Sequence, residues 1–181
     1  MAGFFGIGII GASKAGNAGN LIRTANAFGA QFVFLINPNF RRDINKFDTS
    51  KSSSAIPVFE ESHLESLTIP NGVERVGVEL CEDAIDLPQF AHPRRALYIF
   101  GAERISLPDD VREGCDYMVK IPTKFSLNVA TAGAIVMYDR MRALEGRRGR
   151  PLWPGAPSPE ADVHQHGGPI FRKGRPDERS Q

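Results

Sequence analysis

Asn17 and Arg23, in the segment 17–29, are the first side chains in the sequence with a clear capacity for chemistry. The apolar residues around them share one face of a predicted helix: Leu21, Ile22, Ala25 and Phe28. A guanidinium titrates above about 12 and is a poor base, so Arg23 is suited to binding a phosphate or stabilising a forming oxyanion. The plainer interpretations are a surface arginine and an asparagine that caps the helix.

Two later segments carry further polar side chains. Segment 97–108 places Glu103 directly after Gly101-Ala102, and segment 121–130 contains Ser126 and Asn128. Glu103 is either a hydrogen-bond anchor for Asn17 or Arg23 or an ordinary loop carboxylate, and Ser and Asn are also favoured helix caps. A serine nucleophile is disfavoured, because no G-x-S-x-G occurs and the histidines outside the tail are His63 and His92.

A glycine pattern near the N-terminus matches a dinucleotide-binding fingerprint in its letters alone. Residues 6–11 read G-x-G-x-x-G, but the glycines lie inside an apolar run and five residues precede them. Residues 26–36 contain no Asp or Glu that would bind a ribose hydroxyl. A nucleotide-dependent oxidoreductase is therefore a weak third class of function, and we expect no binding of NAD.

The cysteines and histidines predict no metal site. The two cysteines, Cys81 and Cys115, are too few for a thiolate zinc site or a disulfide framework. His164 and His166 form a loose H-x-H, which is a weak pattern. No signal-peptide pattern and no run of about 20 apolar residues occurs. We therefore expect a cytoplasmic protein without a metal.

Short apolar runs alternate with helical patterns along the chain. The expected strands are residues 4–10, 31–36, 75–80, 96–100 and 117–121, with a strand end and short helix within 58–67. Helices are expected over residues 18–28 and 128–144, a single helical turn over 108–113, and a loop or short helix over 39–55. The longest helix has Asp139, Arg140 and Arg142 near its polar C-terminal end. This alternation predicts an α/β fold, a mainly parallel sheet with helices on both faces.

Charge is distributed unevenly along the 181 residues, which carry 22 Lys+Arg and 21 Asp+Glu. Residues 1–145 have a net charge of −2 and residues 146–181 of +3, and six of the 13 prolines lie in the latter. We expect one domain over 1–148 and a basic, mostly disordered tail over 149–181, with Trp153 docking part of the tail. The tail either binds RNA phosphates or has no partner.

The three polar segments together resemble the signature motifs of the SpoU (TrmH-type) RNA ribose 2′-O-methyltransferases, within the SPOUT class. Their order and separation also match, and the resemblance covers about residues 5–145. Its most specific part is SLNVA, Ser126–Ala130, at the start of the last helix. One departure is Ser106, where the family's second motif usually has a glycine, so we expect the turn near Arg104 to differ from the family's.

The resemblance implies features that periodicity does not supply. The sheet of these enzymes carries a deep C-terminal trefoil knot, which breaks the usual rule against threaded connections. In them S-adenosylmethionine lies bent in the knot and is held mainly by backbone groups of three loops. The positions that match these loops are Glu79, Leu80, Gly101, Ile121 and Leu127.

The implied activity is transfer of a methyl group from S-adenosylmethionine to a ribose 2′-OH of RNA. The resemblance assigns Arg23 to the target phosphate and to the deprotonation of the hydroxyl. Asn17 matches the asparagine of the family's first motif, and Glu103 would anchor Asn17 or Arg23 by a hydrogen bond. Ser126 and Asn128 shape the cofactor pocket and orient the arginine. Direct displacement requires alignment and charge stabilisation. The alternative is a non-catalytic RNA-binding member of the same fold.

The resemblance also implies partners. Because the chain begins at its first strand and resembles small relatives that are often tRNA enzymes, tRNA is favoured over rRNA. The expected RNA contacts are Arg23, Arg41, Arg42, Arg104 and Lys124, with Lys46, Lys51 and Lys120 as further candidates; a solvated surface explains scattered basic residues equally well. A homodimer is expected, with the Arg23 helix of one chain near the partner's cofactor. The apolar residues offered for it are Leu21, Ile22, Phe28, Ala132, Ile135, Val136 and Met137.

Overall fold

The apolar runs of the sequence form one parallel sheet in the computed structural model, which describes residues 3–40, 55–102 and 106–144. Within these residues the sheet has seven strands in the order β3-β2-β1-β6-β4-β7-β5, and every strand pair is parallel. The strands are β1 (Phe4–Ile10), β2 (Phe32–Ile36), β3 (Val58–Glu61), β4 (Glu74–Val78), β5 (Ile85–Asp86), β6 (Arg95–Gly101) and β7 (Tyr117–Lys120). The predicted parallel α/β sheet is confirmed.

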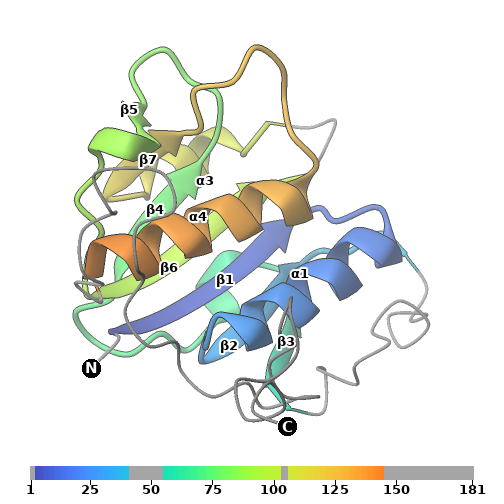
Figure 1. Ribbon diagram of the computed structural model, residues 1–181. Helices are drawn as coiled ribbons and strands as arrows, with labels where there is room; N and C mark the ends of the chain where they lie inside the picture. The colour runs from blue at the N-terminus through green and yellow to red at the C-terminus, as the bar shows by residue number, and fades with distance from the viewer. Residues whose placement is uncertain (1–2, 41–54, 103–105, 145–181) are drawn as a thin grey trace, which may run out of the picture. The chain divides into compact units, whose positions relative to one another are not determined.

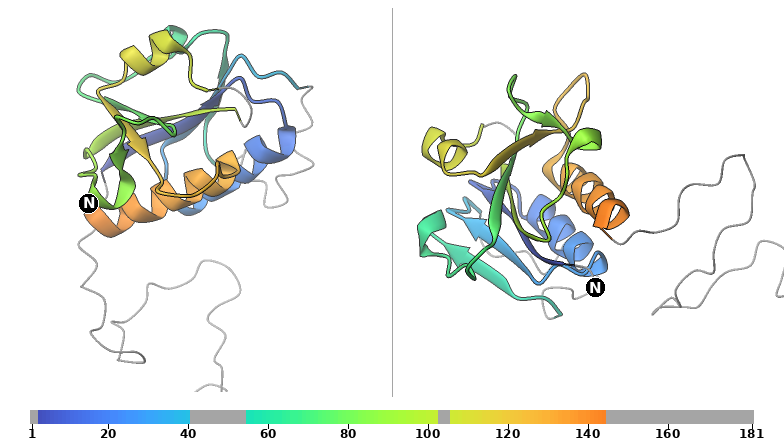
Figure 2. Two further views of the ribbon diagram at one scale, coloured as in Figure 1. Left: turned by 90° about the horizontal axis from the view of Figure 1, so that it is seen from above. Right: turned by 90° about the vertical axis from the view of Figure 1, so that its left-hand side faces the viewer.

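Helices cover both faces of this sheet (Figures 1 and 2). The long helices α1 (Ala15–Ala27) and α4 (Val129–Leu144) lie side by side on one face. The short α3 (Asp109–Glu113) and the 3₁₀ turn η2 (Leu64–Ser66) lie on the other. Each face buries its own hydrophobic cluster, because strand side chains point alternately to the two sides.

The two long helices pack closely at Gly133. A Cβ atom at that position would lie 2.5 Å from Cδ1 of Leu21, which is fully buried. Glycine thus lets α4 approach α1, and with it the loop that precedes α4. Helix α1 carries Asn17, and Asn128 directly precedes α4.

Most predicted elements lie within a few residues of the observed ones, and the differences have physical reasons. Helix α1 begins at Ala15, three residues before the predicted start. The prediction missed these residues because the glycine-rich stretch there lacks an apolar pattern. Strand β5 and the 3₁₀ turn η3 (Leu87–Gln89) were not predicted, since two or three residues carry no periodicity. The predicted loop over 39–55, the domain boundary at 148, the tail and Trp153 lie mostly or wholly outside the described residues.

The residues offered for a dimer are mostly used within the chain. Leu21, Ile22, Val136 and Met137 are buried in the core against the sheet, whereas Ala132 and Ile135 are half-buried. Helix α4 instead presents Tyr138, which is 48% exposed. An apolar face on a helix that covers a sheet is required first by the chain's own core.

The expectation that Arg140 belongs to a polar helix end is wrong, because its side chain is 3% exposed. Its guanidinium donates to the carbonyl oxygens of Pro93 at 2.6 Å, Arg94 at 2.9 Å and Phe4 at 3.5 Å. It also lies over the ring of Phe5, with its Cζ 4.9 Å from the ring centroid. Arg140 therefore fastens the end of α4 to the amino ends of β1 and β6.

His92 and Tyr98 extend this buried network. His92 Nε2 lies 3.1 Å from Asp139 Oδ2, and Nδ1 lies 2.6 Å from the Tyr98 hydroxyl. A carboxylate can accept only, so Nε2 carries the hydrogen and Tyr98 donates to Nδ1 while it accepts from Arg140 at 3.2 Å. Burial lowers the pKa of His92, although Asp139 opposes the shift, and burial raises the pKa of Tyr98 to about 12. Burial therefore favours the neutral form of the imidazole in the folded protein.

Candidate active site

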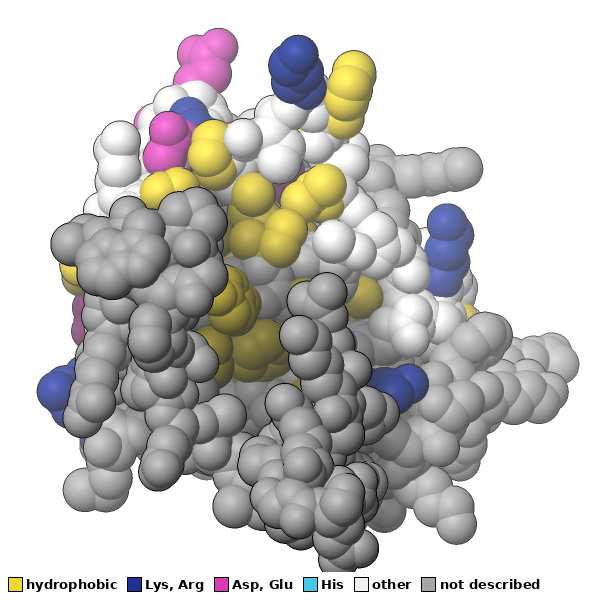
Figure 3. Space-filling model, viewed as in Figure 1, with side chains coloured by type: hydrophobic (Ala, Val, Ile, Leu, Met, Phe, Trp, Pro, Cys, Tyr) yellow, Lys and Arg dark blue, Asp and Glu magenta, His cyan; other side chains and the backbone are white. Residues whose placement is uncertain are grey.

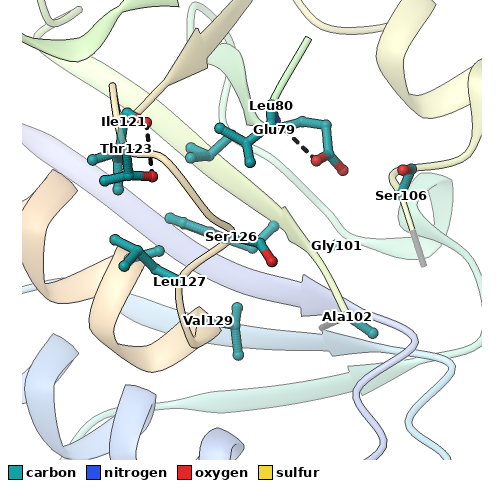
Figure 4. Close-up of a pocket in the computed structure, with 13 residues that line it drawn as sticks. Glu79, Leu80, Gly101, Ala102, Ser106, Ile121, Thr123, Ser126, Leu127 and Val129 are labelled. Atoms are coloured by element: carbon teal, nitrogen blue, oxygen red, sulfur yellow. Dashed lines mark hydrogen bonds between the residues drawn. The ribbon is translucent and has the colours of Figure 1, made fainter. Parts of the chain in front are cut away.

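A pocket of about 300 Å³ opens at the opposite end of the sheet, where β4, β6 and β7 finish (Figure 4). Carboxyl ends of parallel strands meet at one edge, which is where α/β folds commonly bind ligands. The wall is a mixture of apolar and polar residues: Val78, Glu79, Leu80, Phe100, Gly101, Ala102, Ser106, Ile121, Thr123, Ser126, Leu127, Val129 and Ala132. All five predicted cofactor contacts lie in this wall.

Glu79 holds two of the pocket's loops together. Its Oε1 accepts the N–H of Leu80 at 2.9 Å, and its Oε2 accepts the N–H of Leu107 at 3.1 Å. Backbone donors are satisfied this way, and the segment after β4 is tied to the segment after β6. Figure 4 shows the carboxylate directed toward Ser106, the residue that stands where the family's second motif usually has a glycine.

Lys120 was a candidate phosphate contact, and its geometry gives it a different role. Its ammonium donates to the carbonyl oxygens of Cys81 at 3.2 Å and Glu82 at 3.1 Å. Those bonds hold the turn after β4 against the end of β7. Lys120 therefore braces the pocket wall rather than presenting a free cation.

Asn128 joins the third predicted segment to the first. Its Nδ2 donates to Asn17 Oδ1 at 2.9 Å, across 111 positions of sequence. Its Oδ1 accepts the N–H of Ala130 at 3.0 Å, so the same side chain caps α4. The helix-cap interpretation and the site interpretation of Asn128 are therefore compatible.

Asn17 does not cap α1, contrary to the plainer expectation. Lys14 precedes the first helical residue, and Asn17 is the third residue of the helix. Its Nδ2 is buried and has no hydrogen-bond partner among the described residues. Burying an unsatisfied donor costs about 1–3 kcal/mol, which leaves this amide in need of an acceptor.

Arg23 lies on the exposed side of α1 and is not part of the pocket wall. Asn17 and Asn20 lie on the same helix, and Lys124 is exposed on the loop before α4. Glu103 and Arg104, together with Arg41, Arg42, Lys46 and Lys51, lie outside the described residues. The structure thus gathers Ser126, Asn128 and Asn17 at the pocket end and leaves Arg23 outside the pocket of its own chain.

The N-terminal glycine pattern has a packing explanation. Gly6 and Gly8 lie within β1, where a Cβ atom would collide with the side chains of Phe32 and Phe34. They therefore admit two aromatic rings from β2 and form no loop around a phosphate. No cluster of His, Cys, Asp or Glu suited to a metal is present in the part of the chain that the structure describes.

The remaining wall residues were not predicted individually. Val78, Phe100, Ala102, Thr123 and Val129 adjoin predicted contacts at strand ends or loop starts, so their neighbours were a usable signal. In the view of Figure 3, hydrophobic side chains are exposed in the middle of the face that carries α1 and α4, and acidic and basic side chains lie at the top of the molecule. The sequence alone does not reveal which apolar residues leave the core to line a pocket.

Comparison with known proteins agrees with this architecture. The SpoU rRNA Methylase family matches residues 6–138. The chain belongs to this family. It is 28% identical over 138 residues to mouse tRNA (guanosine(18)-2′-O)-methyltransferase TARBP1, covering 71% of this chain and 9% of that protein. It is 25% identical over 174 residues to the Escherichia coli K12 tRNA (guanosine(18)-2′-O)-methyltransferase, covering 88% and 74%.

Solved structures of similar fold include the SpoU methyltransferase AviRb from Streptomyces viridochromogenes in complex with AdoMet. It superposes with a TM-score of 0.67 at 24% identity, over 78% of this chain and 61% of that one. The chain thus spans less than two thirds of AviRb and a small part of TARBP1. At this level of identity the superposition establishes the fold of this SpoU family member. Among the described residues no helix is long and apolar enough to cross a membrane.

Proposed function

We propose that this SpoU family member transfers a methyl group from S-adenosylmethionine to a ribose 2′-OH of RNA. The observation that carries the proposal is the Asn128–Asn17 hydrogen bond, at 2.9 Å. It brings the first and third motif segments together beside a pocket that the second segment also lines. Family membership and the named activities of the relatives point to the same chemistry.

The pocket's lining fits S-adenosylmethionine. Its volume of about 300 Å³ is at the lower end of the range for small-molecule sites. Leu80, Ile121 and Leu127 offer an apolar wall for a purine, Glu79 offers a carboxylate, and Gly101 lets a ligand approach the backbone closely. The bound cofactor would supply an electrophilic methyl group. The chain's part is to hold it away from water and present the ribose oxygen to it.

The polar residues around the pocket act on the RNA. Arg23 binds the target phosphate and stabilises negative charge that forms on the ribose oxygen, since a guanidinium carries its charge at all relevant pH values. Asn17 and Asn128 fix the start of α4, and Ser126 stands at the pocket wall. Glu103 is the acceptor that we propose for the amide of Asn17, whose Nδ2 has no hydrogen-bond partner among the described residues.

The favoured substrate is tRNA. Curated relatives from mouse, Escherichia coli and Sodalis glossinidius are named as tRNA 2′-O-methyltransferases. Lys124 is exposed at the rim and suits a phosphate. Arg41, Arg42 and Arg104 are further proposed contacts with RNA. We place the reaction in the cytoplasm, which is consistent with two free cysteines.

The working unit that we propose is a homodimer with a composite site. Arg23 points outward from α1 and is absent from its own chain's pocket wall. A second copy would bring that guanidinium to a pocket, and Tyr138 on α4 offers exposed apolar surface for the contact. Twofold dimers are the commonest oligomers. A monomer in light scattering at micromolar concentration would contradict this unit.

A deep trefoil knot is part of the same proposal. Strand β7 lies between β4 and β5, which follow one another in the chain. The connection from β4 to β5 therefore spans β7, and the chain leaves β7 through residues 121–128 before it enters α4. Residues 79–94 connect β4 to β6 and include β5. Threading of residues 121–128 through this connection would give the observed strand order.

Methyl transfer to unmodified tRNA tests the proposal. The protein, labelled S-adenosylmethionine and tRNA should give 2′-O-methylnucleosides after nuclease digestion and mass spectrometry. An RNA-binding protein without catalysis would retain the tRNA and transfer no label. Titration calorimetry separates the cofactors: we expect binding of S-adenosylmethionine and none of NAD, and binding of NAD alone would overturn the assignment.

A further inference from the structure

Phe125 is the most exposed large hydrophobic side chain in the described residues, at 80%, followed by Leu80 at 49%. Full burial of a phenylalanine is worth about 1.5–3 kcal/mol, so this ring gains little from the fold. It stands on the loop 121–128, between β7 and α4. Ser126 and Leu127 next to it line the pocket, whereas Phe125 does not.

The loop is held in place by its own hydrogen bonds. The hydroxyl of Thr123 donates to the carbonyl oxygen of Phe125 at 2.8 Å, and the N–H of Thr123 donates to the carbonyl of Ile121 at 2.8 Å. Asn128 closes the loop by capping α4. The backbone that carries Phe125 is therefore fixed on both sides, and its ring is held outward rather than displaced by a loose loop.

The neighbours of Phe125 select among possible partners. Lys124 is exposed directly before it, and the loop after β4 across the pocket carries the exposed acidic residues Glu82 and Asp83. A phosphate backbone is attracted to the Lys124 side of the mouth and repelled from the Glu82 side. An aromatic ring beside a basic group is the combination that binds single-stranded nucleic acid, through base stacking and phosphate contact.

We propose that Phe125 stacks on an unpaired base of the RNA beside the methylated ribose, while Lys124 contacts an adjacent phosphate. The base must be unpaired, because a base within an A-form helix is already stacked on both faces. The two contacts would place the ribose over the pocket that Ser126 and Leu127 line. This inference rests on the proposed function and adds the element that seats the RNA.

Equilibrium binding of unmodified tRNA to variants of the full chain tests the inference without turnover. Phe125→Ala should weaken binding at least about fivefold, since one stacked base contributes about 1–3 kcal/mol. Phe125→Tyr should bind within about twofold of the wild type, and Phe125→Leu should resemble alanine more than tyrosine. Phe59→Ala, at an exposed phenylalanine on the edge strand β3, is the matched control and should bind as the wild type.

Lys124→Ala should lower the affinity and reduce the salt dependence of binding by about one phosphate contact. Affinity for S-adenosylmethionine and the oligomeric state should be unchanged in all these variants. Unaltered tRNA binding by Phe125→Ala, or wild-type binding by Phe125→Leu, would overturn the stacking. So would loss of cofactor affinity or of the dimer in Phe125→Ala, since the ring would then cover the cofactor or the partner. Failure of the wild type to transfer methyl groups would refute the proposed function instead, and the binding comparison would stand.

Discussion

The two ends of the sheet use the same strands for different purposes. At the amino ends of β1 and β6, Arg140 and His92 are buried and almost fully hydrogen-bonded. At the carboxyl ends, the pocket is bordered by exposed Ser126, Phe125 and Leu80. Helices α1 and α4 extend along one face of the sheet, between its two ends, and pack on the core that connects them.

This difference predicts a separation of stability from function. The buried end should determine how firmly α4 is fastened to the sheet, because unsatisfied buried groups are costly. The open end should determine what binds, because its polar groups are available to ligands. Variants at one end should therefore change one property and leave the other nearly intact.

The largest effect expected at the open end is on turnover. Arg23→Ala should lower kcat for RNA methylation about 100- to 1,000-fold, the usual loss when one charge-stabilising group is removed from a reaction site. Binding of S-adenosylmethionine should remain near normal, because Arg23 is outside the pocket wall of its own chain. Steady-state kinetics and calorimetry measure the two quantities.

Arg94→Ala supplies the control for Arg23, since it removes an exposed arginine from the other end of the sheet. It should retain wild-type turnover. Mixing Arg23→Ala chains with Asn128→Ala chains should restore part of the activity if the site is composite, because one mixed site then has both residues. Near-normal turnover by Arg23→Ala alone would refute its assignment.

At the buried end the largest effect is on stability. Arg140→Ala should lower the free energy of unfolding by about 3 kcal/mol or more, because several buried carbonyls lose their donor at once. Urea unfolding measures it. Arg142→Ala, an exposed arginine two residues later, should stay within about 0.5 kcal/mol of the wild type. Equal effects of the two variants would show that the network contributes nothing.

Asn128 contributes both to stability, by capping α4, and to the site, by its bond to Asn17, and two substitutions separate these roles. Asn128→Asp keeps an oxygen to cap α4 but replaces the donor to Asn17 by an acceptor. It should unfold like the wild type and lose turnover. Asn128→Ala should lose turnover and also about 1 kcal/mol of stability with the cap. If Asn128→Asp retains full activity, the Asn17 contact is dispensable.

The smallest expected effect is on the pH dependence of stability. Burial lowers the pKa of His92 below its ordinary value of 6.5. As the pH falls through 6.5, His92 therefore binds a proton in the unfolded chain before it does so in the folded protein. Stability should therefore be constant with pH above about 6.5 and fall below it, with a slope of at most about 1.4 kcal/mol per pH unit. Urea unfolding between pH 5.5 and 7.5 measures the slope.

His92→Asn should flatten that slope, because the titrating group is gone. His63→Asn removes an exposed histidine outside the network and should leave the slope as in the wild type. A slope that persists in His92→Asn would assign the pH dependence to other groups.

The two ends also differ in how far the sequence revealed them. The open end was accessible because it combines residue types at fixed spacings. The structure brings Asn17, Ser126 and Asn128 to the pocket end, and their roles in the reaction stay predictions. The buried end was missed, because Arg140 and Asp139 have the composition of a solvated helix end. The burial of Arg140 depends on the loop around His92 and on the start of β1, which are distant in sequence.

The glycines of β1 show the same limit in reverse. Their letters suggested a ligand loop, and their placement inside a strand argued against it. The reason for them emerged only when β2 placed Phe32 and Phe34 beside them. Local pattern therefore predicts elements well, whereas close approach between elements requires the fold.

Hydrogen exchange measured with and without S-adenosylmethionine tests the contrast between the ends most directly. Cofactor binding should protect backbone amides after β4, β6 and β7, in residues 79–81, 101–107 and 121–128. It should leave residues 92–95 at the buried end unchanged. Protection confined to the buried end, no protection at any of the three loops, or the same protection by NAD would contradict the account.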